Sequence, residues 1–144
     1  SIDGCYGDLQ YVDYSDTDKV IRHWRSGNYS GPKQFYWGWM PPHPTFFVRK
    51  KVYDKFGFFN LDLGSAADYE LMLRFMARHK IKVAYLPEVL VKMRVGGASN
   101  ASLKHRIAAN RMDREAWRVN GLTPYPWTIP LKPIRKIPQY FLRT

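Results

Sequence analysis

The most regular pattern of apolar and polar positions lies in residues 64–86, GSAADYELMLRFMARHKIKVAYL. At about 100° per residue, a helix built from this stretch is apolar on one side. That row consists of Tyr69, Met72, Leu73 and Met76, widened by Leu71 and Phe75. Glu70, Arg74 and Arg78 fall on one polar stripe, which we expect to be solvated, with Glu70 and Arg74 as a favourable i,i+4 pair. The stretch therefore predicts a turn, an amphipathic helix and then a strand.

Two strands and a long loop are predicted before this helix. Tyr, Val and Leu alternate loosely in CYGDLQYVDY, and KVIRHW pairs back after the polar turn SDTD. The next stretch, SGNYSGPKQFYWGWMPPHP, is rich in Gly, Pro and aromatic residues and predicts a long loop. TFFVRKKVYDKF begins extended and turns helical near Val48, and Gly57 is a residue type that ends helices.

After the helix, Pro87 is expected to separate two strands, KVAYL and VLVKMRV. GGASN is a turn, and residues 101–120 predict a second long helix that stops at Gly121. The residues that we expect this helix to bury are Leu103, Ile107 and Trp117. The order of elements predicts an α/β fold with a mixed sheet and flanking helices. The chain divides into two parts. Residues 1–121 form the folded domain, and residues 122–144 form a proline-rich basic tail that cannot be one regular element.

Composition and charge narrow the classes of partner. The 144 residues are 45% apolar and 16% aromatic, which suits one globular domain with a core. The formal net charge is +11, so we expect an anionic partner: nucleic acid, a phosphate-bearing substrate or an anionic membrane surface. Cys5 is the single cysteine, which excludes a disulfide framework within one chain. No apolar run approaches the roughly 18 residues of a spanning helix, and no signal-peptide pattern opens the sequence.

Asp68 is a residue with two competing interpretations. It opens the predicted helix and projects roughly 200° away from Glu70, so it points toward the buried side. It is either an N-cap or first-turn acid, favoured by unpaired amides and the helix dipole, or a carboxylate in a cleft that accepts a proton from a substrate. The two interpretations are compatible, because a position at the start of a helix also holds a carboxylate in place.

The order of these elements and their sequence motifs resemble those of a known family. The stretch PPHPTFFVRKKVYDKFGFFNLDLGSAADYELMLRF, followed by a strand and by MRVGGASN, is similar to the C-terminal half of family-2 glycosyltransferases. These are inverting enzymes of the GT-A fold, and the likeness is greatest to a bacterial subgroup that builds surface polysaccharides. It covers nearly the whole chain and is strongest from Gly38 to Asn120. Because the chain enters a strand almost at once, we expect it to continue a longer protein.

The resemblance implies an activity and a catalytic residue. Such enzymes transfer a sugar from a nucleotide-diphosphate donor to a saccharide or lipid-linked acceptor, and Asp68 matches their proposed general base. A divalent cation, Mg or Mn, is expected, with ligands in the preceding half of the fold, outside this chain. The literal DTD of Asp16 to Asp18 falls in a hairpin turn and is not matched to that metal motif. Residues 1–144 alone are therefore expected to bind nucleotide sugars weakly or not at all.

Further candidates divide into two sets. The acceptor set consists of His43, Trp39, Trp37 and Glu70, where a lone His or a pair of Trp residues is equally compatible with purely structural roles. The set for the nucleotide diphosphate consists of Arg94, Gly96, Gly97 and Ser99. Arginine meets phosphate with two parallel hydrogen bonds, and a Gly-Gly turn lets amides approach an anion. The alternative for this second set is a flexible loop without ligand, and Val95 stands where relatives often carry a His.

Two other classes of function stay open. The net charge and the aromatic residues suit a basic nucleic-acid-binding module, although no known nucleic-acid motif occurs, so we expect no nucleic-acid partner. A folded scaffold without activity is the third reading. The tail LKPIRKIPQYFLRT mixes cations with apolar residues, which suits peripheral contact with an anionic membrane. The expected location is the cytoplasm, including the inner face of the membrane.

Overall fold

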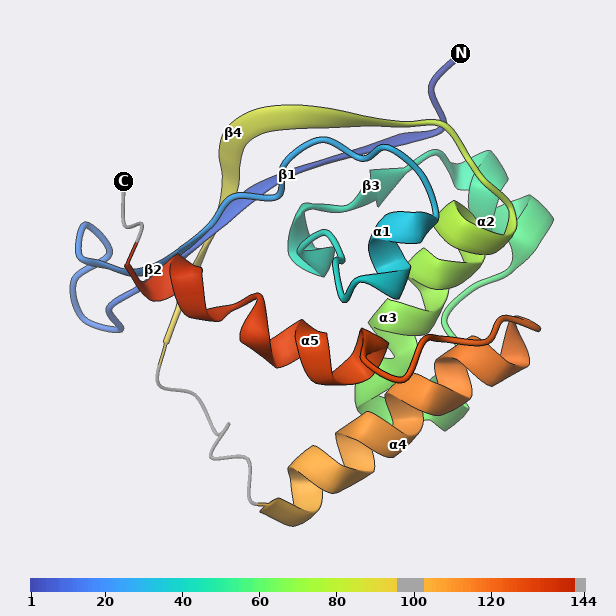
Figure 1. The fold of residues 1–144 in the computed structure, drawn as a ribbon. Helices are drawn as coiled ribbons and strands as arrows, with labels where there is room; N and C mark the ends of the chain where they lie inside the picture. The colour runs from blue at the N-terminus through green and yellow to red at the C-terminus, as the bar shows by residue number, and fades with distance from the viewer. Residues whose placement is uncertain (96–102, 142–144) are drawn as a thin grey trace.

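The structure, a computed structural model, describes residues 1–95 and 103–141. In this part of the chain, one mixed sheet carries helices on one of its sides (Figure 1). The predicted fold class, α/β with a mixed sheet and flanking helices, is therefore confirmed. The predicted turn at residues 96–100 and the side chain of Leu103 lie outside the described residues.

The sheet is built around β1, Gly4–Val12. Along one edge, β1 pairs antiparallel with β2, Val20–Trp24, and with the short β3, Phe47–Val48. Along the other edge it pairs parallel with β4, Val83–Arg94. The predicted β1–β2 hairpin is confirmed. Its turn is held by the carboxylate of Asp13, which accepts hydrogen bonds from the backbone amides of Ser15 and Asp16.

The expectation that Pro87 ends a strand is wrong. Residues Val83–Arg94 form one strand, and its register against β1 shifts between Tyr6 and Asp8, opposite the stretch that contains Pro87. A proline lacks the amide that a regular ladder needs, and an irregularity of this kind accommodates it. The strand thus stays paired with β1 on both sides of Pro87.

The helices alternate with short 3₁₀ turns. The α-helices are α1, Lys33–Tyr36; α2, Lys50–Phe56; α3, Ala67–Met72; α4, Leu103–Val119; and α5, Thr128–Ile134. The 3₁₀ turns are His43–Thr45, Leu61–Ala66 and Ile137–Tyr140, and α3 continues directly as a π-helical segment, Leu73–Arg78. Gly57 (φ +93°) ends α2 and Gly121 (φ +67°) follows α4, as predicted.

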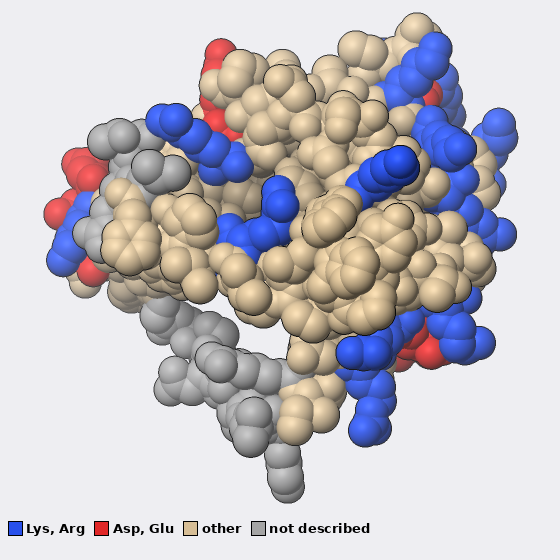
Figure 2. All heavy atoms as spheres, viewed as in Figure 1, with Lys and Arg blue, Asp and Glu red and all other residues tan. Residues whose placement is uncertain are grey.

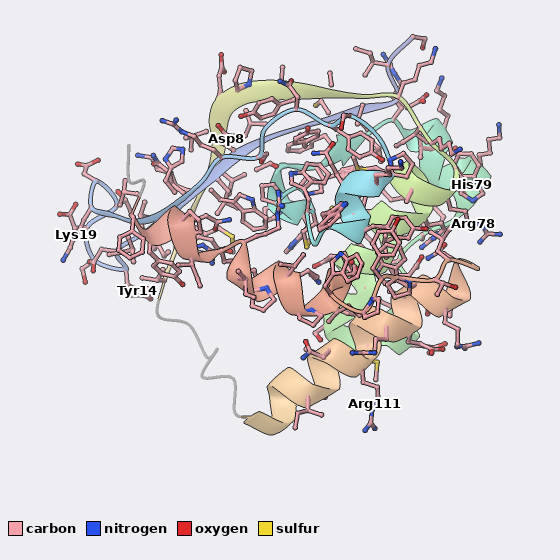
Figure 3. The ribbon with its side chains drawn as sticks, in the orientation of Figure 1. Asp8, Tyr14, Lys19, Arg78, His79 and Arg111 are labelled. Carbon is pink, nitrogen blue, oxygen red and sulfur yellow. The ribbon has the colours of Figure 1, made fainter. Side chains whose placement is uncertain are left out.

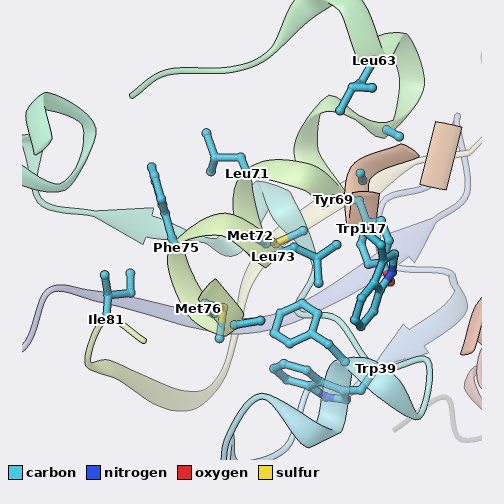
Figure 4. Packing of buried hydrophobic residues seen from close by; sticks show 14 of the residues in the cluster. Trp39, Leu63, Tyr69, Leu71, Met72, Leu73, Phe75, Met76, Ile81 and Trp117 are labelled. Atoms are coloured by element: carbon cyan, nitrogen blue, oxygen red, sulfur yellow. The ribbon is translucent and has the colours of Figure 1, made fainter. Parts of the chain in front are cut away.

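The core lies between the sheet and α3 with its π-helical extension. Tyr69 and Trp117 lie together at one end of the cluster, and Phe75 and Ile81 at the other (Figure 4). The predicted apolar row of the helix is buried throughout. Trp117 is fully buried, as expected, but Ile107 is 53% exposed, which contradicts its predicted burial. The reason is that the first turns of α4 extend beyond the body of the molecule (Figure 1).

The tail, residues 122–144, folds back onto the body as far as it is described. Ile129 is buried, and the Thr128 hydroxyl donates a 2.5 Å hydrogen bond to the carbonyl of Tyr36. Lys132 lies with its ammonium 2.6 Å from the Asp113 carboxylate on α4. In the ranges 1–95 and 103–141, no helix combines the length and the apolar character that crossing a bilayer requires.

Candidate active site

His43 is presented by a rigid segment that is fixed to the sheet. Pro41 and Pro42 are buried, and Thr45 is fully buried. The Thr45 hydroxyl lies within hydrogen-bond distance of both the amide (3.2 Å) and the carbonyl (3.1 Å) of Gly7 on β1. Since prolines also restrict the backbone, His43 projects from a well-defined position and its side chain is 52% exposed.

Asp68 occupies the first turn of α3, and its side chain is 36% exposed. The residue in the capping position is Ala66, and no side chain caps this helix end. Asp68 Oδ2 instead lies 3.3 Å from His43 Nε2. The N-cap interpretation is therefore wrong, whereas a first-turn acid remains favourable because of the helix dipole. Asp68 is half-buried and faces a polar partner from another element.

A small cavity of about 30 Å³ opens beside this pair. It is lined by His43, Phe46, Tyr53, Phe59, Asp68, Leu71 and Met72. A volume of that size holds about one water molecule. A carboxylate and an imidazole thus stand at the rim of a largely apolar and aromatic hollow. Such a surface suits a ligand with an apolar face and a hydroxyl group, where the carboxylate accepts the hydroxyl proton.

Glu70 does not belong to this site, and its predicted solvated position is wrong. It is 2% exposed and pairs with Arg74 through two contacts of 2.7 and 3.0 Å. Its Oε2 also accepts a hydrogen bond from the Asn120 amide at 3.1 Å. The end of α4 and the loop after α2 cover this stripe of the helix, and of its predicted members only Arg78 is exposed. Glu70 therefore joins elements, and it lines a different cavity together with Arg74 and Asn120.

The two tryptophans of the predicted acceptor set do not line the cavity beside Asp68. Trp39 is 5% exposed, donates its indole N–H to the Ser26 carbonyl at 2.9 Å, and lines a different cavity. The expectation that Trp39 approaches the cavity of Asp68 is wrong, because Trp39 packs into the core between aromatic neighbours. Trp37 is 51% exposed and forms a surface cluster with Tyr125 and Trp127 of the tail.

Of the predicted diphosphate set, Arg94 alone is described. It is the last residue of β4, and its guanidinium lies 6.0 Å from the centre of the Tyr14 ring, at the hairpin end away from α3. Figure 3 places Tyr14 and Lys19 at this hairpin end. Gly96, Gly97 and Ser99 lie outside the described residues.

Asp16 and Asp18 form a turn, in agreement with the prediction. Asp16 Oδ1 accepts a 3.0 Å hydrogen bond from the amide of Asp18, and both residues are exposed. Within the described ranges, no group of three or more His, Cys, Asp or Glu side chains gathers at a distance suited to a metal ion.

Three aromatic residues of the Asp68 cavity, Phe46, Tyr53 and Phe59, were missed by the sequence reasoning. They come from a turn, from α2 and from the loop after it. No periodicity relates these segments to α3, so the sequence carries no local signal for their meeting. Thr45, which fixes the segment of His43, was missed for the same reason.

Comparisons of the chain with protein-family models, with curated proteins and with solved structures find no match.

Proposed function

We propose that this chain is the acceptor-binding half of an inverting glycosyltransferase with a GT-A-like fold, in which Asp68 is the general base. The observation that carries the proposal is the position of Asp68. Its carboxylate lies at the start of a helix, without a capping role, beside an aromatic hollow and 3.3 Å from His43. A carboxylate that acted as the N-cap would instead bond backbone amides at the helix end.

The chemistry that this arrangement supports is a direct displacement. The acceptor hydroxyl attacks the anomeric carbon of the donor sugar while its proton passes to a carboxylate oxygen of Asp68. The bond between that carbon and the nucleotide diphosphate breaks on the opposite face, which inverts the configuration. His43 orients Asp68 through the 3.3 Å contact, and the side chains of Tyr53 and Phe59, which line the same cavity, offer apolar surface to the acceptor. The divalent cation, whose ligands are expected outside this chain, would neutralise the charge that develops on the leaving diphosphate.

The experiment that tests this function replaces Asp68 with Asn in the intact protein. The amide keeps the size of the side chain but cannot accept the hydroxyl proton, so turnover of a nucleotide sugar should fall by roughly 10²–10⁴-fold. Asp62→Asn is the matched control, because Asp62 is an exposed carboxylate six positions before Asp68. Near-normal turnover in a folded Asp68→Asn enzyme would exclude the catalytic role.

A further inference from the structure

A second cavity, separate from that of Asp68, lies between the end of β2 and the C-terminal tail. Its volume is about 100 Å³, and its walls include Trp24, Ser26 and Trp39 on one side and Arg135, Lys136 and Gln139 on the other. Figure 2 shows Lys and Arg side chains around a hollow in the middle of the face that carries α5. The tail therefore completes a concave surface together with residues from the first third of the chain.

The charge of this cavity is positive. Arg25, Lys132, Arg135 and Lys136 contribute to its lining, and the residues that line it within the described ranges include no Asp or Glu. The charge of Lys132 is balanced, because its ammonium lies 2.6 Å from the Asp113 carboxylate. Arg25, Arg135 and Lys136 line the same small volume. Such an arrangement raises the local potential and favours an anion.

Arg22 adds a buried cation that contacts a residue of the cavity lining. It is 9% exposed, and its Nε donates a 2.5 Å hydrogen bond to Gln139, which itself lines the cavity. Its guanidinium lies 4.5 Å from the centre of the Tyr11 ring and 5.4 Å from that of Trp24. Among the described residues, its Nη2 is buried without a hydrogen-bond partner. A buried and incompletely paired guanidinium is costly unless an anion lies near.

The ionisation of Lys136 agrees with this picture. Desolvation lowers the pKa of its ammonium, and the neighbouring charges of Arg22 and Lys132 lower it further, while the Asp113 carboxylate acts in the opposite direction. These cations therefore repel one another, and a bound anion would relieve that repulsion.

We propose that this cavity binds a phosphate monoester group, either of a free ester or of a lipid headgroup. A dianion matches several converging cations, and the planar guanidinium of Arg135 suits phosphate oxygens. The small volume admits a terminal phosphate rather than a chain of phosphodiesters. Ile137 and Phe141, which are 56% and 80% exposed on the same tail, would meet the apolar part of a lipid. The proposal is independent of any role of Asp68.

The test measures two kinds of binding by the 144-residue chain. Inorganic phosphate is titrated by calorimetry, and phosphatidylcholine vesicles with or without phosphatidic acid are tested by co-sedimentation. The double variant Arg135→Gln/Lys136→Gln should weaken binding by about tenfold or more, because it removes two charge-assisted contacts. The matched control is Lys50→Gln/Lys51→Gln on α2, which removes the same net charge from exposed side chains. It should stay within about twofold of the unmodified chain.

The two arms identify the source of the phosphate. If the Arg135→Gln/Lys136→Gln variant loses binding of inorganic phosphate, the natural ligand is a free phosphate ester. If it loses binding only to vesicles that contain phosphatidic acid, the natural ligand is a lipid headgroup. The proposal is overturned if the unmodified chain binds neither probe. It is also overturned if both double variants weaken binding equally, since general electrostatic attraction then explains it. Circular dichroism checks folding, and the single variants Arg135→Gln and Lys136→Gln replace the double variant if that one unfolds.

Discussion

Glu70 and Arg74 form a two-pronged ion pair in the interior of the protein. Arg74 Nη2 lies 2.7 Å from Glu70 Oε1, and Arg74 Nε lies 3.0 Å from Glu70 Oε2. Arg74 also donates to the carbonyls of Phe56 and Phe58, at 2.8 and 2.7 Å, and Glu70 accepts from Asn120. One pair of side chains thus ties α3 to the loop after α2 and to the end of α4.

Removing the charge of Glu70 should therefore destabilise the fold strongly. Glu70→Gln leaves the Arg74 guanidinium buried without its counter-ion, and the free energy of unfolding should fall by about 3 kcal/mol. Urea unfolding followed by circular dichroism measures the change. Glu115→Gln is the control, because Glu115 pairs with Arg118 on the exposed surface of α4 and should hardly move the midpoint. Equal midpoints for both variants would show that Glu70 is not structural.

The sequence was sufficient for features that depend on neighbouring residues. The turn at Asp13 to Asp16, the helix stops at Gly57 and Gly121 and the buried row of α3 each follow from local geometry. It was insufficient where distant segments decide the outcome. Glu70 is buried because α4 covers it, and Ile107 is exposed because its turn of α4 lies beyond the body.

In the candidate site too, local features were predicted from the sequence, whereas contacts between distant segments were not. The place of Asp68 at the start of a helix is a local property, and it was predicted. Its contact with His43 depends on the hydrogen bonds between Thr45 and Gly7, which fix the proline-rich segment to β1. Trp39 was misplaced because its burial depends on Tyr6, Tyr29 and other aromatic neighbours rather than on its own loop.

The anchor of the His43 segment can be tested at Thr45. Thr45→Val keeps the shape but removes the hydroxyl that bonds Gly7, so the free energy of unfolding should fall by roughly 1–3 kcal/mol. Hydrogen exchange of the Gly7 amide, which now donates to Thr45 Oγ1 at 3.2 Å, should accelerate. Thr123→Val is the control at an exposed position and should change stability by no more than about 0.5 kcal/mol. Unchanged exchange at Gly7 would contradict the anchoring role.

His79 should make stability depend on pH. Burial lowers its pKa from the ordinary value of 6.5, and the charges of Arg78, Arg74 and Lys55 lower it further. Below pH 6.5 the unfolded chain therefore takes up the proton before the folded one does, so stability is full above that pH and falls as the solution is acidified. Figure 3 shows His79 beside Arg78.

The measurement compares urea midpoints of the unmodified chain and of His79→Gln at pH values on either side of 6.5. The variant should lose less stability on acidification, because one of the depressed histidines is gone. A smaller slope should remain, since burial also lowers the pKa of His23. Identical slopes for the two proteins would mean that His79 does not titrate differently in the folded and unfolded states.

The packing of the tail against α1 can be tested with two glycines of similar backbone conformation. Gly38 and Gly27 have φ values of +81° and +75°, so alanine strains the backbone at both positions by roughly 1–2 kcal/mol. A methyl group at Gly38 would lie 2.9 Å from Leu131 Cβ and 3.0 Å from the Lys132 amide nitrogen, whereas one at Gly27 meets nothing within 4 Å. Gly38→Ala should therefore cost about 1–3 kcal/mol more than Gly27→Ala, because of overpacking. It should also speed hydrogen exchange in α5, which is pushed away from the body. Equal losses of stability, with unchanged exchange in α5, would mean that the tail does not pack on the body in solution.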